Sequence, residues 1–336
     1  MRADPPIARP PSRTPRRRPR DMLVGLGLFG LFAAGLIGLA GATGWEETRA
    51  QIARLGPAQG AALLALALAN YLFRGVRWHV FARRLGLPTT LGQDLRHFLG
   101  GFAMVVTPGR VGELVRLRWL GRETGWPIDR TAPLAIVDRA SDLAAMALIL
   151  ALGVSLASSH MAGALPVAVL ALALAVAATR PRILAAAVTL AHRAVGRVPR
   201  LFGRMRRATR ALAQVSGPGL LAGVLALGLS GWLAEGYAFH LLLGWLGADL
   251  GFWRAVTIFV FATLAGGLTG APGGVGGAEA AMISLLALDG VPMEISVPAT
   301  AIIRVTTLWF ALVLGLAIFP FAEARSKRGA HALENR

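Results

Sequence analysis

The sequence predicts an all-α fold, a polytopic bundle of membrane helices with about six full spans and two broken or re-entrant helix hairpins. Of the 336 residues, 55% are hydrophobic and 15% are charged, and the mean hydropathy is +0.59. Soluble domains seldom combine so much apolar content with so little charge. In addition, several apolar runs approach the ~20 residues that a helix needs to cross the hydrocarbon core, and arginines gather between these runs.

The six full spans are expected in chain order near residues 22–43, 57–73, 133–157, 164–178, 219–246 and 296–320. The first run is longer than the usual ~7–15 apolar residues of a signal peptide, so we expect it to be retained as an anchor. Two further apolar stretches are interrupted. Residues 95–120 are broken at Thr107-Pro108-Gly109, and residues 253–289 are broken at Ala271-Pro272-Gly273-Gly274.

Arginine distribution predicts the orientation of these spans. The first 20 residues, the 74–96 segment, the 179–218 loop and the C-terminal tail are all rich in arginine. The positive-inside rule assigns these segments, and therefore both termini, to the cytoplasmic side of an inner membrane. We thus expect a basic disordered cytoplasmic tail at 1–20, a membrane domain at 21–322 and a cytoplasmic tail at 323–336. The first broken stretch then enters from the cytoplasm and the second from outside.

The two breaks carry related sequences. Residues 107–117 read TPGRVGELVRL and residues 271–286 read APGGVGGAEAAMISLL. Both contain a small residue, then Pro-Gly-x-Val-Gly, then a glutamate that leads into an apolar helix. Because the two copies enter from opposite faces, they predict an inverted repeat, and transporters build substrate sites from broken helices at such repeat interfaces.

A broken helix inside a membrane has a chemical use. Proline removes a hydrogen-bond donor and glycine permits a sharp reversal. The following half-helix then begins at depth with free N–H groups and a positive dipole end, which favour an anion and above all a phosphate. The alternative is a kinked helix pair that uses Gly266, Gly270 and Gly274, at four-residue spacing, only for close packing.

Charged residues inside apolar runs indicate the same region. They are Asp138, Arg139, Asp142, Glu235, Glu279 and Arg304. Each would cost ~2.5–3.5 kcal/mol or less at the bilayer centre if it faced lipid, so we expect these groups to face inward and pair. Arg139 reaches Asp142 at i, i+3 on one helix. The alternative reading is a set of salt bridges that only lock the bundle.

Several other functions are excluded or disfavoured. The chain has no cysteine, and its six histidines are scattered without metal-ligand spacing, so neither a metal site nor a cofactor is expected. The net charge of +18 comes from arginines that cluster between the apolar runs, and this distribution disfavours nucleic acid as a partner. The basic 179–218 loop is either an interfacial helix on an anionic leaflet or a solvated loop.

These residues also carry a family resemblance. The chain resembles the lysylphosphatidylglycerol synthase transmembrane-region family, which is also called the flippase-like domain or uncharacterised integral membrane family. The resemblance rests on the patterns PG-x-x-GE-x-x-R at 108–116, DR-x-x-D-L at 138–143 and PGG-x-G-x-x-E at 272–279, together with the late Arg304. The resemblance covers about residues 20–322 and implies lipid flipping. Family members often have Glu where Asp138 stands. No soluble aminoacyl-transferase domain follows, so lysyl transfer is not expected.

The sequence therefore predicts a flippase or transporter of an anionic lipid or polyprenyl-linked head group, with no catalytic residues. The half-helix N-termini would hold the phosphate, the arginines would supply countercharge, and the carboxylates would orient the arginines or bind cationic groups or protons. The candidate substrate-binding residues are Pro108, Gly109, Arg110, Gly112, Glu113, Arg116, Asp138, Arg139, Asp142, Glu235, Pro272, Gly273, Gly274, Gly276, Glu279 and Arg304. The alternatives are a membrane enzyme acting on a lipid-linked substrate and a non-transporting scaffold for a lipid-synthesis partner.

Overall fold

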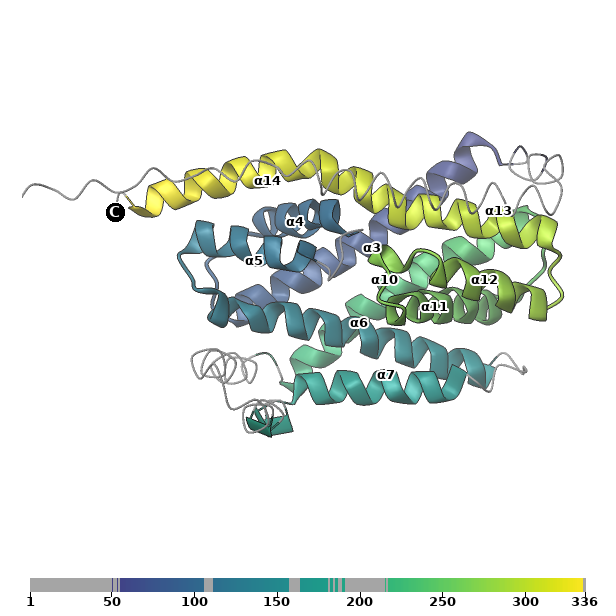
Figure 1. The fold of residues 1–336 in the computed structure, drawn as a ribbon, viewed down its shortest axis with the longest axis horizontal. Helices are drawn as coiled ribbons and strands as arrows, with labels where there is room; N and C mark the ends of the chain where they lie inside the picture. The colour runs from purple at the N-terminus through teal and green to yellow at the C-terminus, as the bar shows by residue number, and fades with distance from the viewer. Residues whose placement is uncertain are drawn as a thin grey trace, which may run out of the picture.

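The computed structural model describes residues 55–105, 111–156, 164–180 and 217–334, with a few single residues and pairs elsewhere. Within these ranges the chain is a bundle of helices with no β-strand (Figure 1), which confirms the all-α class. The predicted N-terminal tail, the first span at 22–43, the tip of the first hairpin at 106–110 and most of the 179–218 loop lie outside the described residues.

Four long helices form the body of the bundle. They are α3 (Pro57–Arg84), α6 (Ile128–Leu156), α7 (Ala164–Thr179) and α10 (Pro218–Trp245). Both α3 and α10 begin with a proline, which fits the first helical turn because its missing N–H would have no partner there. Large apolar side chains on α7 are exposed, as expected for a helix that faces lipid.

The end of α3 corrects the predicted topology. The expected span stopped at residue 73, and residues 74–96 were assigned to a basic cytoplasmic loop. In the structure α3 continues to Arg84, and both Arg74 and Arg77 are buried inside the bundle. These two arginines therefore do not contribute to a cytoplasmic loop, and only the later part of the segment leaves the helix.

The first broken stretch forms a helix hairpin. It consists of α4 (Leu91–Gly100), the short 3₁₀ helix η1 (Gly101–Met104) and α5 (Val111–Thr124). The α4 helix begins at a capping box, in which the Thr90 hydroxyl accepts from the Gln93 N–H at 3.3 Å and the Gln93 side chain accepts from the Thr90 N–H at 3.4 Å.

The second broken stretch forms another hairpin, made of α11 (Phe252–Leu268), the 3₁₀ turn η4 (Pro272–Gly274) and α12 (Gly277–Leu288). The predicted break is present. Gly273 (φ 66°, ψ 7°) and Gly276 (φ 86°, ψ −54°) adopt left-handed or related conformations that favour glycine. The small residues also allow close packing, because a Cβ added to Gly266 would lie 2.6 Å from the Cβ of Ala278.

The last helical segment runs past both hairpins. It comprises α13 (Met293–Arg304), a π-helical turn at Val305–Trp309 and α14 (Phe310–Glu334). α13 packs against α12, whereas α14 packs against α4 and α5. Two helical segments of the described chain are long and apolar enough to cross a membrane, Gly219–Trp245 and Met293–Ala332.

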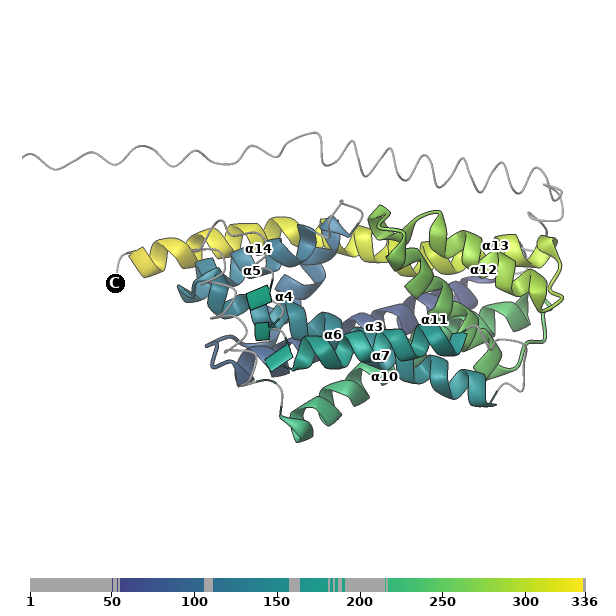
Figure 2. The ribbon, with the colours of Figure 1, turned by 60° about the horizontal axis from the view of Figure 1, so that its bottom comes forward.

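The two hairpins enter the bundle from opposite ends (Figures 1 and 2). The α5–α6 connection lies at the end where α14 finishes, and the α12–α13 connection lies at the other end. The core is correspondingly divided. One apolar cluster surrounds α10, α11 and α12, and another surrounds α3, α4 and α5.

Candidate functional site

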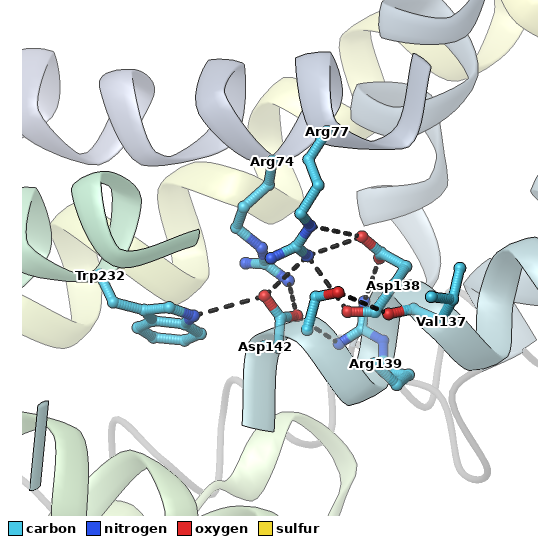
Figure 3. A network of polar contacts seen from close by, with 8 residues as sticks. Arg74, Arg77, Val137, Asp138, Arg139, Asp142 and Trp232 are labelled. Carbon is cyan, nitrogen blue, oxygen red and sulfur yellow. Dashed lines mark hydrogen bonds and ion pairs between the residues drawn. The ribbon is translucent and has the colours of Figure 1, made fainter. Parts of the chain in front are cut away.

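Charged side chains from α3 and α6 meet in the interior of the bundle (Figure 3). Arg74 and Arg77 lie one turn apart on α3, and Asp138 and Asp142 lie one turn apart on α6, so each pair presents one face to the other helix. The fully buried Arg77 donates from Nη2 to Asp138 Oδ1 at 2.6 Å and to Asp142 Oδ1 at 2.8 Å. A single guanidinium therefore holds both carboxylates.

Three further groups complete this network. Arg74 donates to Asp142 Oδ2 at 2.8 Å, and Arg139 pairs with the same oxygen at 3.3 Å, the predicted i, i+3 contact. Trp232 on α10 donates from Nε1 to Asp142 Oδ1 at 3.3 Å. We call Arg74, Arg77, Asp138, Arg139, Asp142 and Trp232 the central cluster. It contains three arginines and two aspartates, which leaves one positive charge in excess.

Glycines on α10 allow this helix to approach the polar face of α3. A Cβ on Gly228 would lie 3.1 Å from Nη1 of Arg77, and a Cβ on Gly231 would lie 2.6 Å from Oδ1 of Asn70. Glu235 follows one turn later on the same helix and is buried. The fully buried Asn70 lies beside it without a hydrogen bond of good geometry, and the charges that act most strongly on Glu235 are those of Arg74, Asp142 and Arg304.

A second polar group lies at the break between α11 and α12. Arg304 donates from Nε to Glu279 Oε1 at 2.6 Å and from Nη2 to the Gly273 carbonyl at 2.9 Å. The other Glu279 oxygen accepts from the Gly276 N–H at 2.6 Å, so Glu279 caps α12. We call Gly273, Gly276, Glu279 and Arg304 the hairpin cluster. The helix N-terminus that was expected to favour an anion thus holds the chain's own carboxylate, while Pro272 and Gly274 form the turn itself.

Tyr71 links the two clusters. Its hydroxyl donates to the Thr307 carbonyl at 2.6 Å, inside the π-helical turn that follows Arg304. π turns release backbone carbonyls from the regular ladder and are frequent at functional sites. Tyr71 also lies within electrostatic range of Arg74, Glu235 and Arg304. The charges of α3, α10 and α13 therefore belong to one polar region.

Arg116 on α5 lies at the edge of this region. It is buried, and its guanidinium lies 4.1 Å from the centroid of the Phe98 ring, over the same ring that Arg74 approaches at 5.8 Å. A Cβ on Gly101 would lie 2.2 Å from Arg116 Nε, so a larger residue there would require the Arg116 side chain to move. Of the other first-hairpin candidates, Pro108, Gly109 and Arg110 lie outside the described residues, whereas Gly112 and Glu113 are described only as part of the helix α5.

Acidic residues outside the site join α4 to α5 within the first hairpin and join this hairpin to α14. Glu123 accepts from Arg96 at 2.9 Å, and Glu323 accepts from Trp119 at 2.7 Å and from Arg122 at 3.0 Å. Burial raises the pKa of Glu123, but the adjacent His97 and the charge of Arg96 outweigh it and lower the pKa below its usual value. These contacts position the hairpin.

Five residues of the polar region were not predicted, namely Asn70, Tyr71, Arg74, Arg77 and Trp232. A signal existed for the two arginines: they follow an apolar run without a turn residue, and their i, i+3 spacing complements the i, i+4 spacing of Asp138 and Asp142. Within the part of the chain that the structure describes, no group of three or more acidic or histidine side chains forms a candidate metal site.

Comparison with known proteins gives one family and two relatives. The family model described as "Lysylphosphatidylglycerol synthase TM region" matches residues 22–315. Two proteins of Methanothermobacter thermautotrophicus, each described as "UPF0104 membrane protein", are similar to this chain. One is 32% identical over 96 residues, covering 29% of this chain and 28% of that protein. The other is 29% identical over 90 residues, covering 27% of each.

Proposed function

This chain belongs to the lysylphosphatidylglycerol synthase transmembrane-region family and is an integral membrane protein, and from this premise we propose that it moves an anionic amphiphile between the two leaflets. The amphiphile is a lipid or a polyprenyl-linked head group. The sign of the substrate's charge follows from the charge of the site: a site in the membrane core with an excess of arginine selects a negatively charged head group.

One observation carries the proposal, namely the central cluster, with its unequal number of arginines and aspartates, in the interior of an apolar bundle. Replacing buried ion pairs with well-packed apolar residues is often neutral or stabilising, so stability alone does not explain why these charges are present. Ionisable residues inside membranes usually mark substrate or ion pathways.

The hairpin cluster supports a mechanism of exchange. Arg304 and the Gly276 N–H are both engaged by Glu279. A phosphate offers the same kind of oxygen acceptors as a carboxylate and can accept both from an arginine and from a helix N-terminus. In our proposal the incoming phosphate replaces Glu279, and Glu279 returns when the substrate leaves.

The remaining candidates have subsidiary roles in this proposal. Arg116 and Arg139 supply further countercharge, and Arg139 has the most exposed side chain in the central cluster's ion pairs, at 28%. The half-helix N-terminus of the first hairpin, with Arg110 and Glu113, is proposed to act as the counterpart of the second hairpin. An anionic leaflet is proposed to contact the basic 179–218 loop.

Purified protein in vesicles of phosphatidylethanolamine and phosphatidylglycerol tests the proposal. We expect it to speed the movement of fluorescent phosphatidylglycerol between leaflets, measured by quenching with an impermeant reductant, more than that of fluorescent phosphatidylcholine. If vesicles with the protein moved each lipid no faster than protein-free vesicles, the result would contradict transport of these head groups and would favour the enzyme or scaffold alternatives.

Variants at Arg304 test the site itself. Arg304→Ala removes the countercharge and should abolish transport, whereas Arg304→Lys keeps the charge without the two-pronged contact and should recover activity only partly. The double variant Arg304→Ala/Glu279→Gln should fold at least as well as Arg304→Ala, since it also removes the Glu279 carboxylate that Arg304→Ala leaves without its arginine, yet remain inactive. Arg254→Ala breaks the ion pair with Asp289 at the end of the bundle and serves as the control that stays active. An active double variant would contradict the site and favour a scaffold.

A further inference from the structure

Glu235 differs from the other buried carboxylates of the membrane core. Asp138, Asp142 and Glu279 each have an arginine nitrogen within 2.8 Å. Among the residues that the structure describes, no arginine, lysine or histidine lies within ion-pair distance of Glu235, although this residue is only 4% exposed. Glu235 can therefore bind or release a proton without breaking an ion pair of the described chain.

The surroundings of Glu235 place it between the two clusters. α10 packs against α3, α6, α11 and α13. The charged and titratable groups of these helices that lie within electrostatic range of Glu235 are Tyr71 and Arg74 on α3, Asp142 on α6 and Arg304 on α13. From α11, the charged residue Arg254 is engaged by Asp289 at the end of the bundle.

The charge of the two clusters depends on Glu235. The central cluster has one positive charge in excess, and the hairpin cluster is balanced by one arginine and one glutamate. An ionised Glu235 brings the sum to zero, whereas a neutral Glu235 leaves one positive charge. Uncompensated charge is costly in a low-dielectric interior, so the two forms of Glu235 suit an empty site and an anion-filled site respectively.

We propose that Glu235 is a proton-binding site that is loaded together with the anionic substrate, so that one proton accompanies each phosphodiester charge. This inference rests on the proposed function. On the side where the site is open, the Glu235 carboxylate accepts one proton and becomes a neutral acid, and the released positive charge of the arginines pairs with the anion. On the other side the anion departs, the same proton leaves, and the carboxylate again neutralises the arginines.

The position of Tyr71 fits this coupling. Its hydroxyl is bound to the backbone of the π turn that follows Arg304, and it lies within electrostatic range of both Glu235 and Arg304. A change of charge at Glu235 therefore acts on Arg74 of the central cluster and on Arg304 of the hairpin cluster.

Infrared spectroscopy tests the proton site without any transported lipid. Wild-type protein in lipid nanodiscs should show a protonated-carboxyl band whose intensity changes with pH, and this band should be missing from Glu235→Gln. Asp289→Asn is the matched control, because it makes the same acid-to-amide change in a carboxylate at the end of the bundle and should retain the band. A titrating band that persists unchanged in Glu235→Gln would overturn the inference.

Transport under opposed pH gradients tests the coupling. The rate of movement of fluorescent phosphatidylglycerol in one direction should differ between inside-acid and outside-acid vesicles for the wild type and for Asp289→Asn. For Glu235→Gln the two rates should be equal, so that their ratio is one, even if the variant transports the lipid more slowly than the wild type. A wild-type ratio of one with clear transport would overturn the coupling and leave the proposed function intact. Absence of transport contradicts the proposed function, and the infrared result then decides the proton site separately.

Discussion

At the scale of single residues, Arg77 is the centre of the polar region. Its side chain is fully buried and donates to both aspartates of α6. The planar guanidinium makes this possible, because its nitrogens reach two acceptors at fixed angles, whereas a lysine ammonium is a compact point charge. The central cluster therefore requires arginine at this position and does not merely require a positive charge.

We expect Arg77→Ala to destabilise the protein strongly. The change leaves Asp138 and Asp142 with fewer counterions in the interior, and breaking a buried pair in this way costs about 3–5 kcal/mol. Arg77→Lys should lower the stability of the protein less than Arg77→Ala does. The exposed Arg84, at the end of the same helix, gives the control Arg84→Ala, which should change little. Thermal unfolding in detergent measures all three, and similar melting temperatures for Arg77→Ala and Arg84→Ala would contradict this role.

The sequence predicted one side of this network better than the other. Asp138 and Asp142 were recognisable because carboxylates inside an apolar run need a partner. Arg74 and Arg77 are harder to recognise, since arginines after an apolar run also satisfy the positive-inside rule and are then expected in a cytoplasmic loop. Their partners lie more than sixty residues away, at separations of 61 and 65 residues for the two Arg77 contacts. The i, i+3 spacing of the two arginines is compatible with the i, i+4 spacing of the aspartates, but it does not identify which carboxylates they bind.

At the scale of elements, the hairpin α11–α12 depends on small residues at its helix contact. A Cβ at Gly266 would lie 2.6 Å from the Ala278 Cβ and 2.9 Å from its backbone nitrogen. We therefore expect Gly266→Ala to separate the two helices, to lower the melting temperature and to disturb the hairpin cluster beside the contact.

The matched control for Gly266→Ala is a glycine-to-alanine change that should raise the stability of the protein. Gly223 on α10 has nothing within 4 Å of an added Cβ, so Gly223→Ala should stabilise the helix by about 0.5–1 kcal/mol through lower backbone entropy in the unfolded chain. Melting temperatures of the two alanine variants, measured in the same detergent, give the comparison. A Gly266→Ala variant as stable as Gly223→Ala would contradict close packing as the purpose of Gly266.

An element can be predicted from the sequence when the residues that cause it lie within that element. The break at residues 271–274 was predicted because proline and glycine act on their own backbone. The span expected near 133–157 lies almost entirely within α6, which begins at Ile128 and continues through Pro133, so this proline does not mark the start of the helix. The π turn after Arg304 had no local signal, because its Thr307 carbonyl is held by Tyr71, 236 residues earlier in the chain.

At the scale of the whole molecule, polar contacts hold the described chain at both ends and in the middle. Glu123 and Glu323 hold the first hairpin and α14 at one end, and Arg254 pairs with Asp289 across the second hairpin at the other. The segment α13–α14 passes both hairpins and changes its hydrogen-bond pattern between them. The two hairpins are thus anchored at opposite ends, and the break of the second hairpin contacts the buried Arg304, an arrangement that suits a site reached from either side.

This arrangement makes a definite prediction of topology. The chain contains no cysteine, so single cysteines introduce unique labels, and the cysteine-free parent is the control. Arg130→Cys lies next to the α5–α6 connection and Glu294→Cys lies next to the α12–α13 connection. Because the two hairpins enter from opposite ends and the arginine-rich segments are expected inside, an impermeant thiol reagent added outside intact cells should label Glu294→Cys alone. Arg130→Cys should react only after the membrane is opened. Labelling of both from one side would contradict hairpins that enter from opposite faces, whereas exchange of the two results would keep the hairpins and reverse the orientation derived from arginine.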